Sequence, residues 1–139
     1  MPLAEKQRQL IEDLLLIPDV QERLSALTSY AARMHLPPEQ QTDANRVSGC
    51  VSRVWLSGEL RGGRTRFDCE ADSPMVKALV ALLCDLYSDA TPQEVSLVEP
   101  EIWEGCHFTK MLTPTRLNGL AHVRARIRQL ALEWCAAME

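Results

Sequence analysis

The stretch VWLSGELRGGRTRFDCEA, residues 54–71, decides the fold because it predicts a β-hairpin. Apolar or small residues alternate with polar ones on both sides of Gly62-Gly63, and this period of two is typical of strands with one buried face. Two adjacent glycines tolerate positive φ at both positions, as a two-residue hairpin turn requires. One face of the predicted sheet carries Val54, Leu56, Gly58, Leu60, Thr65, Phe67, Cys69 and Ala71. The other face is mostly polar or charged, so we expect it to be wet or only partly covered.

Helical patterns precede the hairpin. An apolar stripe in residues 10–15 predicts a first helix that Pro18 ends, and residues 19–34 are predicted to form a second. The Pro37-Pro38 pair and the polar residues that follow it predict a long loop that leads into the hairpin.

Helical patterns also follow the hairpin. Asp72 is the predicted N-cap of a strongly apolar helix with Pro74 in its first turn, Thr91 opens a short helix with a capping box, and Thr113-Pro114 opens the last helix. This order of helices, hairpin and helices predicts a single α+β domain over residues 1–139. We expect a small antiparallel sheet of about three strands packed with several helices.

Charge and hydropathy argue against two classes of partner. The 139 residues carry a formal net charge of −4, so no overall basic field attracts nucleic acid or an anionic membrane. No run approaches the roughly 18 apolar residues that span a bilayer. The first residues lack the apolar core of a signal peptide, so we expect a cytoplasmic protein with reduced cysteines.

The five cysteines differ in their surroundings. They form no CxxC pair, and the spacing of cysteines and histidines does not predict a zinc site. Cys69 and Cys84 fall on apolar stripes and are predicted to be core residues, because free cysteine packs as a small hydrophobe. Cys106 follows a glycine and precedes His107, so it is a candidate reactive thiol, although a loop cysteine without chemistry fits the spacing better.

Cys50 lies on no apolar stripe. It follows Gly49, which allows a sharp turn and the close approach of another molecule, and Arg46 and Arg53 are near enough in sequence to favour the nucleophilic thiolate. From the residues alone, a packed cysteine at the start of a strand and a reactive thiol are equally good interpretations.

Four blocks of the chain resemble the SufE family of sulfur acceptors for cysteine desulfurases. They are NRVSGCVSRVW (45–55), EADSPMVK (70–77), LLCDLYSDATP (82–92) and LTPTRLNGL (112–120). The chain departs from the usual family pattern at Glu70, Ala71 and Ala78, which are near the thiol motif but not in it. The resemblance covers nearly the whole chain and implies a fold related to the IscU scaffold.

The resemblance implies a role for Cys50 as the position that accepts sulfur as a persulfide. The donor would be a pyridoxal-phosphate-dependent desulfurase of the SufS type or the CsdA type, and the chain itself would bind no cofactor. The sulfur would pass to an iron–sulfur scaffold such as SufBCD, and the resemblance implies a monomer. Arg116 matches the arginine of the last block and is a candidate for supporting the loop or contacting the partner; Asp72 is a candidate for holding the thiol loop, although the N-cap role is favoured.

Two other functions compete with the sulfur carrier. One is a thiol redox enzyme that uses Cys50 together with Cys106, and the other is a binding module in which all cysteines only pack. The carrier hypothesis makes a structural prediction. Cys50 should be partly buried in the free protein, within an apolar pocket near Val47, Val51 and Trp55, because a persulfide needs shelter from cytosolic thiols.

Overall fold

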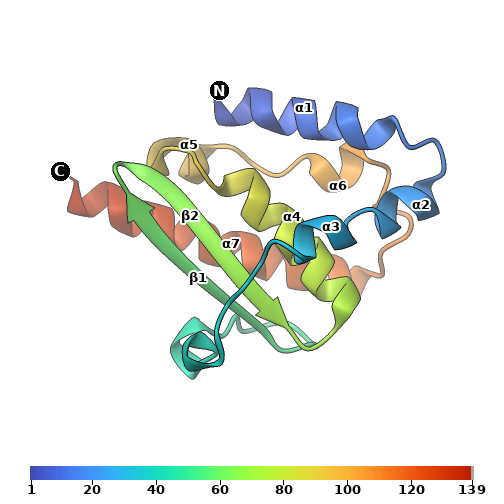
Figure 1. Ribbon diagram of the computed structural model, residues 1–139. Coiled ribbons are helices and arrows are strands. Elements are labelled where there is room, and N and C mark those ends of the chain that lie inside the picture. The colour runs from blue at the N-terminus through green and yellow to red at the C-terminus, as the bar shows by residue number, and fades with distance from the viewer. Residues whose placement is uncertain (139) are drawn as a thin grey trace.

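A computed structural model describes residues 1–138 (Figure 1). Its helices and strands, in chain order, are α1 (Leu3–Leu15), α2 (Val20–Ser25), α3 (Thr28–Ala31), β1 (Val54–Arg61), β2 (Arg64–Ala71), α4 (Pro74–Tyr87), α5 (Pro92–Leu97), α6 (Ile102–Gly105) and α7 (Pro114–Ala137), with two 3-10 turns, η1 (Pro38–Gln40) and η2 (Asp43–Asn45), before β1. Figure 1 shows the hairpin lying across α4 and α7, with α1 on the far side of α4. The α+β prediction is therefore confirmed.

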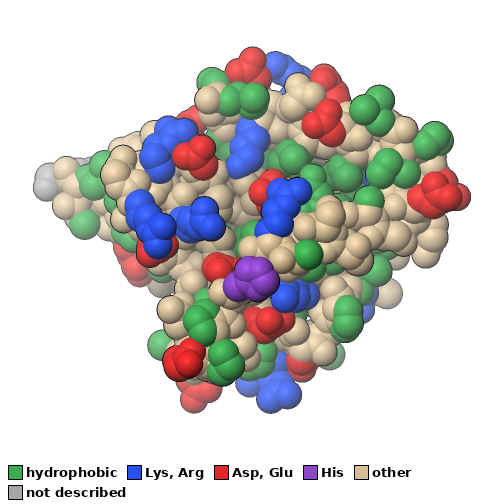
Figure 2. Space-filling model, viewed as in Figure 1, with side chains coloured by type: hydrophobic (Ala, Val, Ile, Leu, Met, Phe, Trp, Pro, Cys, Tyr) green, Lys and Arg blue, Asp and Glu red, His purple; other side chains and the backbone are tan. Residues whose placement is uncertain are grey.

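The hairpin has the predicted register. Val54 pairs with Ala71 at the open end and Arg61 with Arg64 at the turn, and Gly62 and Gly63 have φ values of 56° and 79°. Leu56, the most central apolar residue of β1, is 1% exposed. The outer face is polar, and Figure 2 shows Lys and Arg side chains gathered over the turn end of the hairpin.

The number of strands is smaller than predicted. Within residues 1–138 the sheet has two strands, and a single bridge between Arg46 and Trp55 stands where a third strand would begin. The chain leaves this edge two residues later because Ser48 and Gly49 turn away, with Gly49 at a φ of 88°. The residues that follow this bridge instead form the loop that carries Cys50.

Helix α4 forms the centre of the core. Residues 78–84 of this helix are all 1% exposed or less, and the helix contacts β2, α1, α3 and α7. A helix that is apolar on every side is stable only when surrounded, and each fully buried leucine contributes about 2 kcal/mol to that burial. The side of α4 that faces both the hairpin and α7 is where the pocket described below is found.

The second predicted helix, residues 19–34, is divided into α2 and α3. At the division the hydroxyl of Thr28 donates to the carbonyl of Ser25 (3.0 Å) and that of Ser29 to the carbonyl of Ala26 (2.9 Å). Hydroxyl side chains that bond the preceding turn compete with helical backbone bonds, which explains the interruption. The other predicted starts, at Thr91 and Thr113, are confirmed by side-chain caps.

No helix within residues 1–138 combines the length and apolarity that crossing a membrane would need.

Candidate functional site

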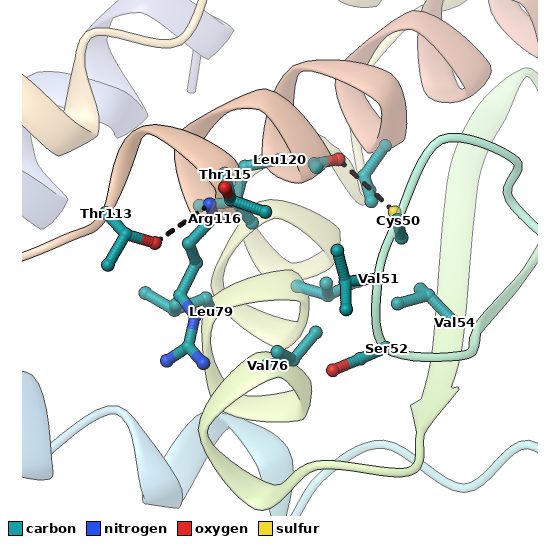
Figure 3. Close-up of a pocket in the computed structure, with 13 residues that line it drawn as sticks. Cys50, Val51, Ser52, Val54, Val76, Leu79, Thr113, Thr115, Arg116 and Leu120 are labelled. Atoms are coloured by element: carbon teal, nitrogen blue, oxygen red, sulfur yellow. Dashed lines mark hydrogen bonds between the residues drawn. The ribbon is translucent and has the colours of Figure 1, made fainter.

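Cys50 lies at the tip of a loop, residues 47–53, between η2 and β1. The base of this loop is closed by a hydrogen bond from the backbone N–H of Val47 to the carbonyl of Val54 (2.9 Å). The tip faces the N-terminal half of α7 and the adjacent turns of α4 (Figure 3). Three segments that are distant in the sequence therefore meet at one thiol.

The thiol of Cys50 is half-buried, as predicted. Its Sγ donates to the carbonyl oxygen of Gly119 on α7 at 3.5 Å, a weak contact for a sulfur donor. Cys50 also lies close to the backbone of Gly119, where a β-carbon built on the glycine would be 3.6 Å from Sγ, an ordinary contact distance. The thiol is thus turned toward the helix rather than toward solvent.

An apolar pocket of about 150 Å³ lies beside Cys50. Its apolar wall consists of Val54, Val76, Leu79, Val80, Leu120 and Val123, and Thr113, Thr115 and Arg116 add polar groups. We expected the thiol to lie in an apolar pocket near Val47, Val51 and Trp55; the pocket is present, but only one of these residues lines it. Val51 lines the pocket but is 86% exposed, and neither Val47 nor Trp55 is part of the lining. Most of the wall comes from α4 and α7.

Burial raises the pKa of the Cys50 thiol, and the nearby Arg46 guanidinium only partly offsets this effect. The desolvated thiolate is disfavoured because an apolar environment does not solvate its charge. Arg46 favours the thiolate, as predicted, but in the resting loop burial has the larger effect on this pKa. Arg53 does not contribute because its guanidinium is directed to Asp72 (Nε to Oδ2, 3.3 Å).

Asp72 holds the end of the loop and does not cap α4. Its carboxylate accepts a hydrogen bond from the backbone N–H of Arg53 (3.1 Å), and its own N–H donates to the carbonyl of Arg53 (3.1 Å). The N-cap of α4 is Ser73, whose hydroxyl accepts from the N–H of Val76. The predicted N-cap was therefore wrong by one residue. The hydrogen bonds of Asp72 support the alternative role, which is to hold the loop.

Arg116 contributes a half-buried guanidinium to the pocket. Its backbone N–H completes the Thr113 cap of α7 (3.1 Å), while its side chain extends toward α4 on the opposite side of the pocket from Cys50 (Figure 3). Among residues 1–138 the guanidinium has no hydrogen-bond or ion-pair partner. It is a cation available to a ligand or to another protein.

His122 is a neighbour of the loop that the sequence did not predict. Its ring lies against Gly49, the residue before Cys50. No local pattern connects these positions, because one belongs to the loop and the other to the middle of α7. Only the packing of the loop on the helix reveals the contact.

The other cysteines do not share the site. Cys69, Cys84 and Cys106 are fully buried, and Cys135 is half-buried near the end of α7. Burial raises the pKa of Cys106 to about 11, so its thiol is protonated and inert at neutral pH. Cys106 does not line the pocket, which removes the geometric basis for a redox pair with Cys50.

Comparisons with known proteins agree with the four sequence blocks. A family model described as "SufE: Fe-S metabolism associated domain" matches residues 8–131. A SufE-like protein of Rhizobium etli is 30% identical over 135 residues, which are 93% of this chain and 91% of the relative. A SufE-like protein of Synechocystis is 32% identical over 106 residues, covering 76% of this chain and 67% of the relative.

Two further similarities concern the fold and a larger protein. The solution structure of a hypothetical protein from Thermus thermophilus superposes with a TM-score of 0.75 at 27% identity, covering 92% of this chain and 94% of that one. Chloroplastic quinolinate synthase of Arabidopsis thaliana is 32% identical over 98 residues, 69% of this chain but 14% of that protein. A domain similar to this chain therefore also occurs within a much longer polypeptide.

Proposed function

This chain belongs to the SufE family, which is associated with iron–sulfur metabolism, and from that premise we propose that it is a sulfur carrier whose acceptor is Cys50. The donor is the persulfide of a pyridoxal-phosphate-dependent cysteine desulfurase, of the SufS or CsdA type. The recipient is an iron–sulfur assembly scaffold of the SufBCD kind. The carrier acts as one domain and as a monomer, and it binds no cofactor of its own.

The transfer is a thiol–persulfide exchange. The thiolate of Cys50 attacks the outer sulfur of the desulfurase persulfide, the sulfur–sulfur bond of that persulfide breaks, and the desulfurase cysteine leaves as a thiolate. A new sulfur–sulfur bond forms on Cys50, whose proton was lost when the attacking thiolate formed. No net oxidation occurs, because one sulfur–sulfur bond replaces another.

The observation that carries the proposal is a half-buried thiol at the tip of a loop whose two ends are fixed. Val47 and Arg53 anchor the ends through Val54 and Asp72. At rest, burial raises the pKa of Cys50 and so disfavours its nucleophilic thiolate. When the tip leaves the pocket, water again solvates the sulfur, so the same movement that exposes Cys50 also lowers its pKa and activates it.

The pocket suits the product as well as the thiol. Its volume of about 150 Å³ exceeds the roughly 30 Å³ that a water molecule occupies in the liquid, so one additional sulfur atom fits beside Cys50. The apolar part of the wall does not solvate the charge of a thiolate that would reduce the persulfide. A loaded carrier that folds its tip back would therefore protect the persulfide until the scaffold binds.

Arg116 is the residue we assign to contact with the desulfurase. Its guanidinium borders the pocket and lacks a partner among the described residues. An arginine of this kind forms bidentate bonds to a carboxylate, so an acidic side chain at the mouth of the desulfurase active site would match it.

One experiment tests the assignment of Cys50. The protein is incubated with a cysteine desulfurase and free cysteine, digested without reductant, and analysed by mass spectrometry. We expect one added sulfur atom on the Cys50 peptide and none on that peptide in Cys50→Ser. A sulfur adduct that persists in Cys50→Ser, or that resides on the Cys106 peptide, would overturn the assignment.

A further inference from the structure

One face of α7 forms a cradle for the thiol loop. Gly119, His122 and Arg126 are spaced by three and four residues and so lie on the same side of the helix. The carbonyl of Gly119 accepts from Cys50 Sγ, the ring of His122 lies against Gly49, and the guanidinium of Arg126 donates to the carbonyls of Arg46 and Ala44. From Gly119 to Arg126 along α7, the contacted residues therefore run in the opposite chain direction, from Cys50 to Ala44.

The ring of His122 occupies the space that a β-carbon on Gly49 would need. A β-carbon built on Gly49 would lie 2.5 Å from Cδ2 of His122 and 2.6 Å from both Cγ and Nε2. Contact with three ring atoms at nearly equal distance means that the backbone of Gly49 lies against the ring face. Gly49 also has a φ of 88°, a region that residues with a β-carbon rarely adopt. The backbone conformation at this position therefore favours glycine, and a β-carbon would fit only if the ring of His122 moved.

Cys50 also packs against the hydrophobic core, but the tip has few hydrogen bonds. Cys50 makes only a weak bond to Gly119, and Val51 is 86% exposed. His122 is itself exposed, although its ring lies against the loop. The packing of the imidazole on Gly49 therefore adds to the contacts that keep Cys50 turned toward the pocket.

We propose that His122 is a positioning residue that sets how readily Cys50 leaves its pocket. It acts through Gly49 and does not touch the reacting sulfur. This role of His122 in sulfur transfer rests on the proposed function. The burial of Cys50 that His122 maintains is a property of the free protein and can be measured without a desulfurase. Removing the ring should raise the fraction of molecules with an open loop.

The test is the rate at which iodoacetamide alkylates Cys50 in the free protein. The rate is measured on the Cys50 peptide by mass spectrometry, because the half-buried Cys135 could also react. In His122→Ala we expect this rate to rise roughly five- to thirtyfold, the change that a modest shift in the opening equilibrium produces. His122→Phe retains a planar ring and should restore most of the slow rate. His35→Ala, which removes an exposed histidine outside the lining of the Cys50 pocket, is the matched control and should leave the rate unchanged.

A double-mutant cycle isolates the contact. Gly49→Ala should accelerate alkylation strongly in the wild-type background, because its β-carbon meets the ring. In the His122→Ala background the same change should have a smaller effect, since only the backbone strain remains. Independent, multiplicative effects of the two substitutions would overturn the contact as the cause.

A second readout connects the loop to sulfur transfer. If opening precedes binding, a larger open fraction lowers the carrier concentration that half-saturates the desulfurase and leaves the turnover at saturation unchanged. An unchanged alkylation rate in His122→Ala, with an unchanged thermal midpoint, would refute the role of His122 while leaving Cys50 as acceptor intact. Wild-type protein that accepts no sulfur would refute the carrier function, and the alkylation series would still report on His122.

Discussion

Asp72 accepts two hydrogen bonds from one residue: the backbone N–H of Arg53 donates to Oδ1 at 3.1 Å, and the Nε of the same arginine donates to Oδ2 at 3.3 Å. This pair joins the end of the thiol loop to the residue that precedes the N-cap of α4. The loop is therefore tied to the helix that supplies much of the pocket wall, and a change at either residue should alter how well the loop shelters Cys50.

Asp72→Ala should loosen the loop without unfolding the protein. Both partners are substantially exposed, with 58% of the Arg53 side chain and 37% of the Asp72 side chain accessible, so the loss of stability should be below about 1 kcal/mol. Alkylation of Cys50 should nevertheless accelerate, because the backbone N–H of Arg53 loses its side-chain acceptor, and only the bond from the N–H of residue 72 to the carbonyl of Arg53 remains. Asp72→Asn keeps an acceptor oxygen for the Arg53 N–H and should remain close to wild type. If Asp72→Asn accelerates alkylation as much as Asp72→Ala does, the charge of Asp72 restrains the loop, and the bond from the Arg53 N–H does not.

Gly119→Ala should stabilise the protein. Glycine in the interior of a helix costs about 1 kcal/mol relative to alanine, and the new methyl group would meet Cys50 Sγ at 3.6 Å, an ordinary contact distance. We expect a higher thermal midpoint and an alkylation rate within about twofold of wild type. A lower midpoint would mean that the loop packs on α7 more tightly than this distance implies.

Arg116→Ala should weaken coupling to the desulfurase without affecting the shelter of Cys50. The guanidinium makes no bond that holds the loop, so the alkylation rate of the free protein should be unchanged. The concentration of carrier that half-saturates the desulfurase should rise by about tenfold or more, the effect of losing one charge-assisted bond. Arg116→Lys should recover only part of this loss, because lysine lacks the bidentate geometry. A rise in the alkylation rate would instead assign Arg116 to loop support.

Stability should decline at alkaline pH in a way that depends on Cys106. Burial raises the pKa of its thiol from 9.0 to about 11 in the folded state, so the folded protein holds this proton more tightly than the unfolded chain. The stabilisation is complete below pH 9 and is lost as the pH rises toward 11. In Cys106→Ala, the decrease in unfolding free energy between these pH values should be smaller than in wild type. Cys135→Ala, at a half-buried position, is the control; identical pH profiles for wild type and Cys106→Ala would contradict the shift.

Several features could be predicted from sequence because a few neighbouring residues determine them. The alternation around Gly62-Gly63 determines the register of the hairpin, and the caps at Thr91 and Thr113 mark where α5 and α7 begin. Each depends on a backbone angle, a side-chain bond or a face of a strand within one or two turns of chain. For the same reason Cys69 and Cys84 could be predicted as core residues from their stripes.

The sequence by itself determined the α+β class, the helical and hairpin segments, and the candidacy of Cys50 through its glycine and the blocks shared with a family. The tertiary structure alone decided which residues shelter that thiol: the wall from α4 and α7, the anchor at Asp72, and the ring of His122 against Gly49. It also decided the sign of the Cys50 pKa shift, because desolvation depends on what surrounds a group and not on the charges next to it in the chain. Local bonding rules act over a few residues, whereas a pocket exists only when segments far apart in the chain pack together.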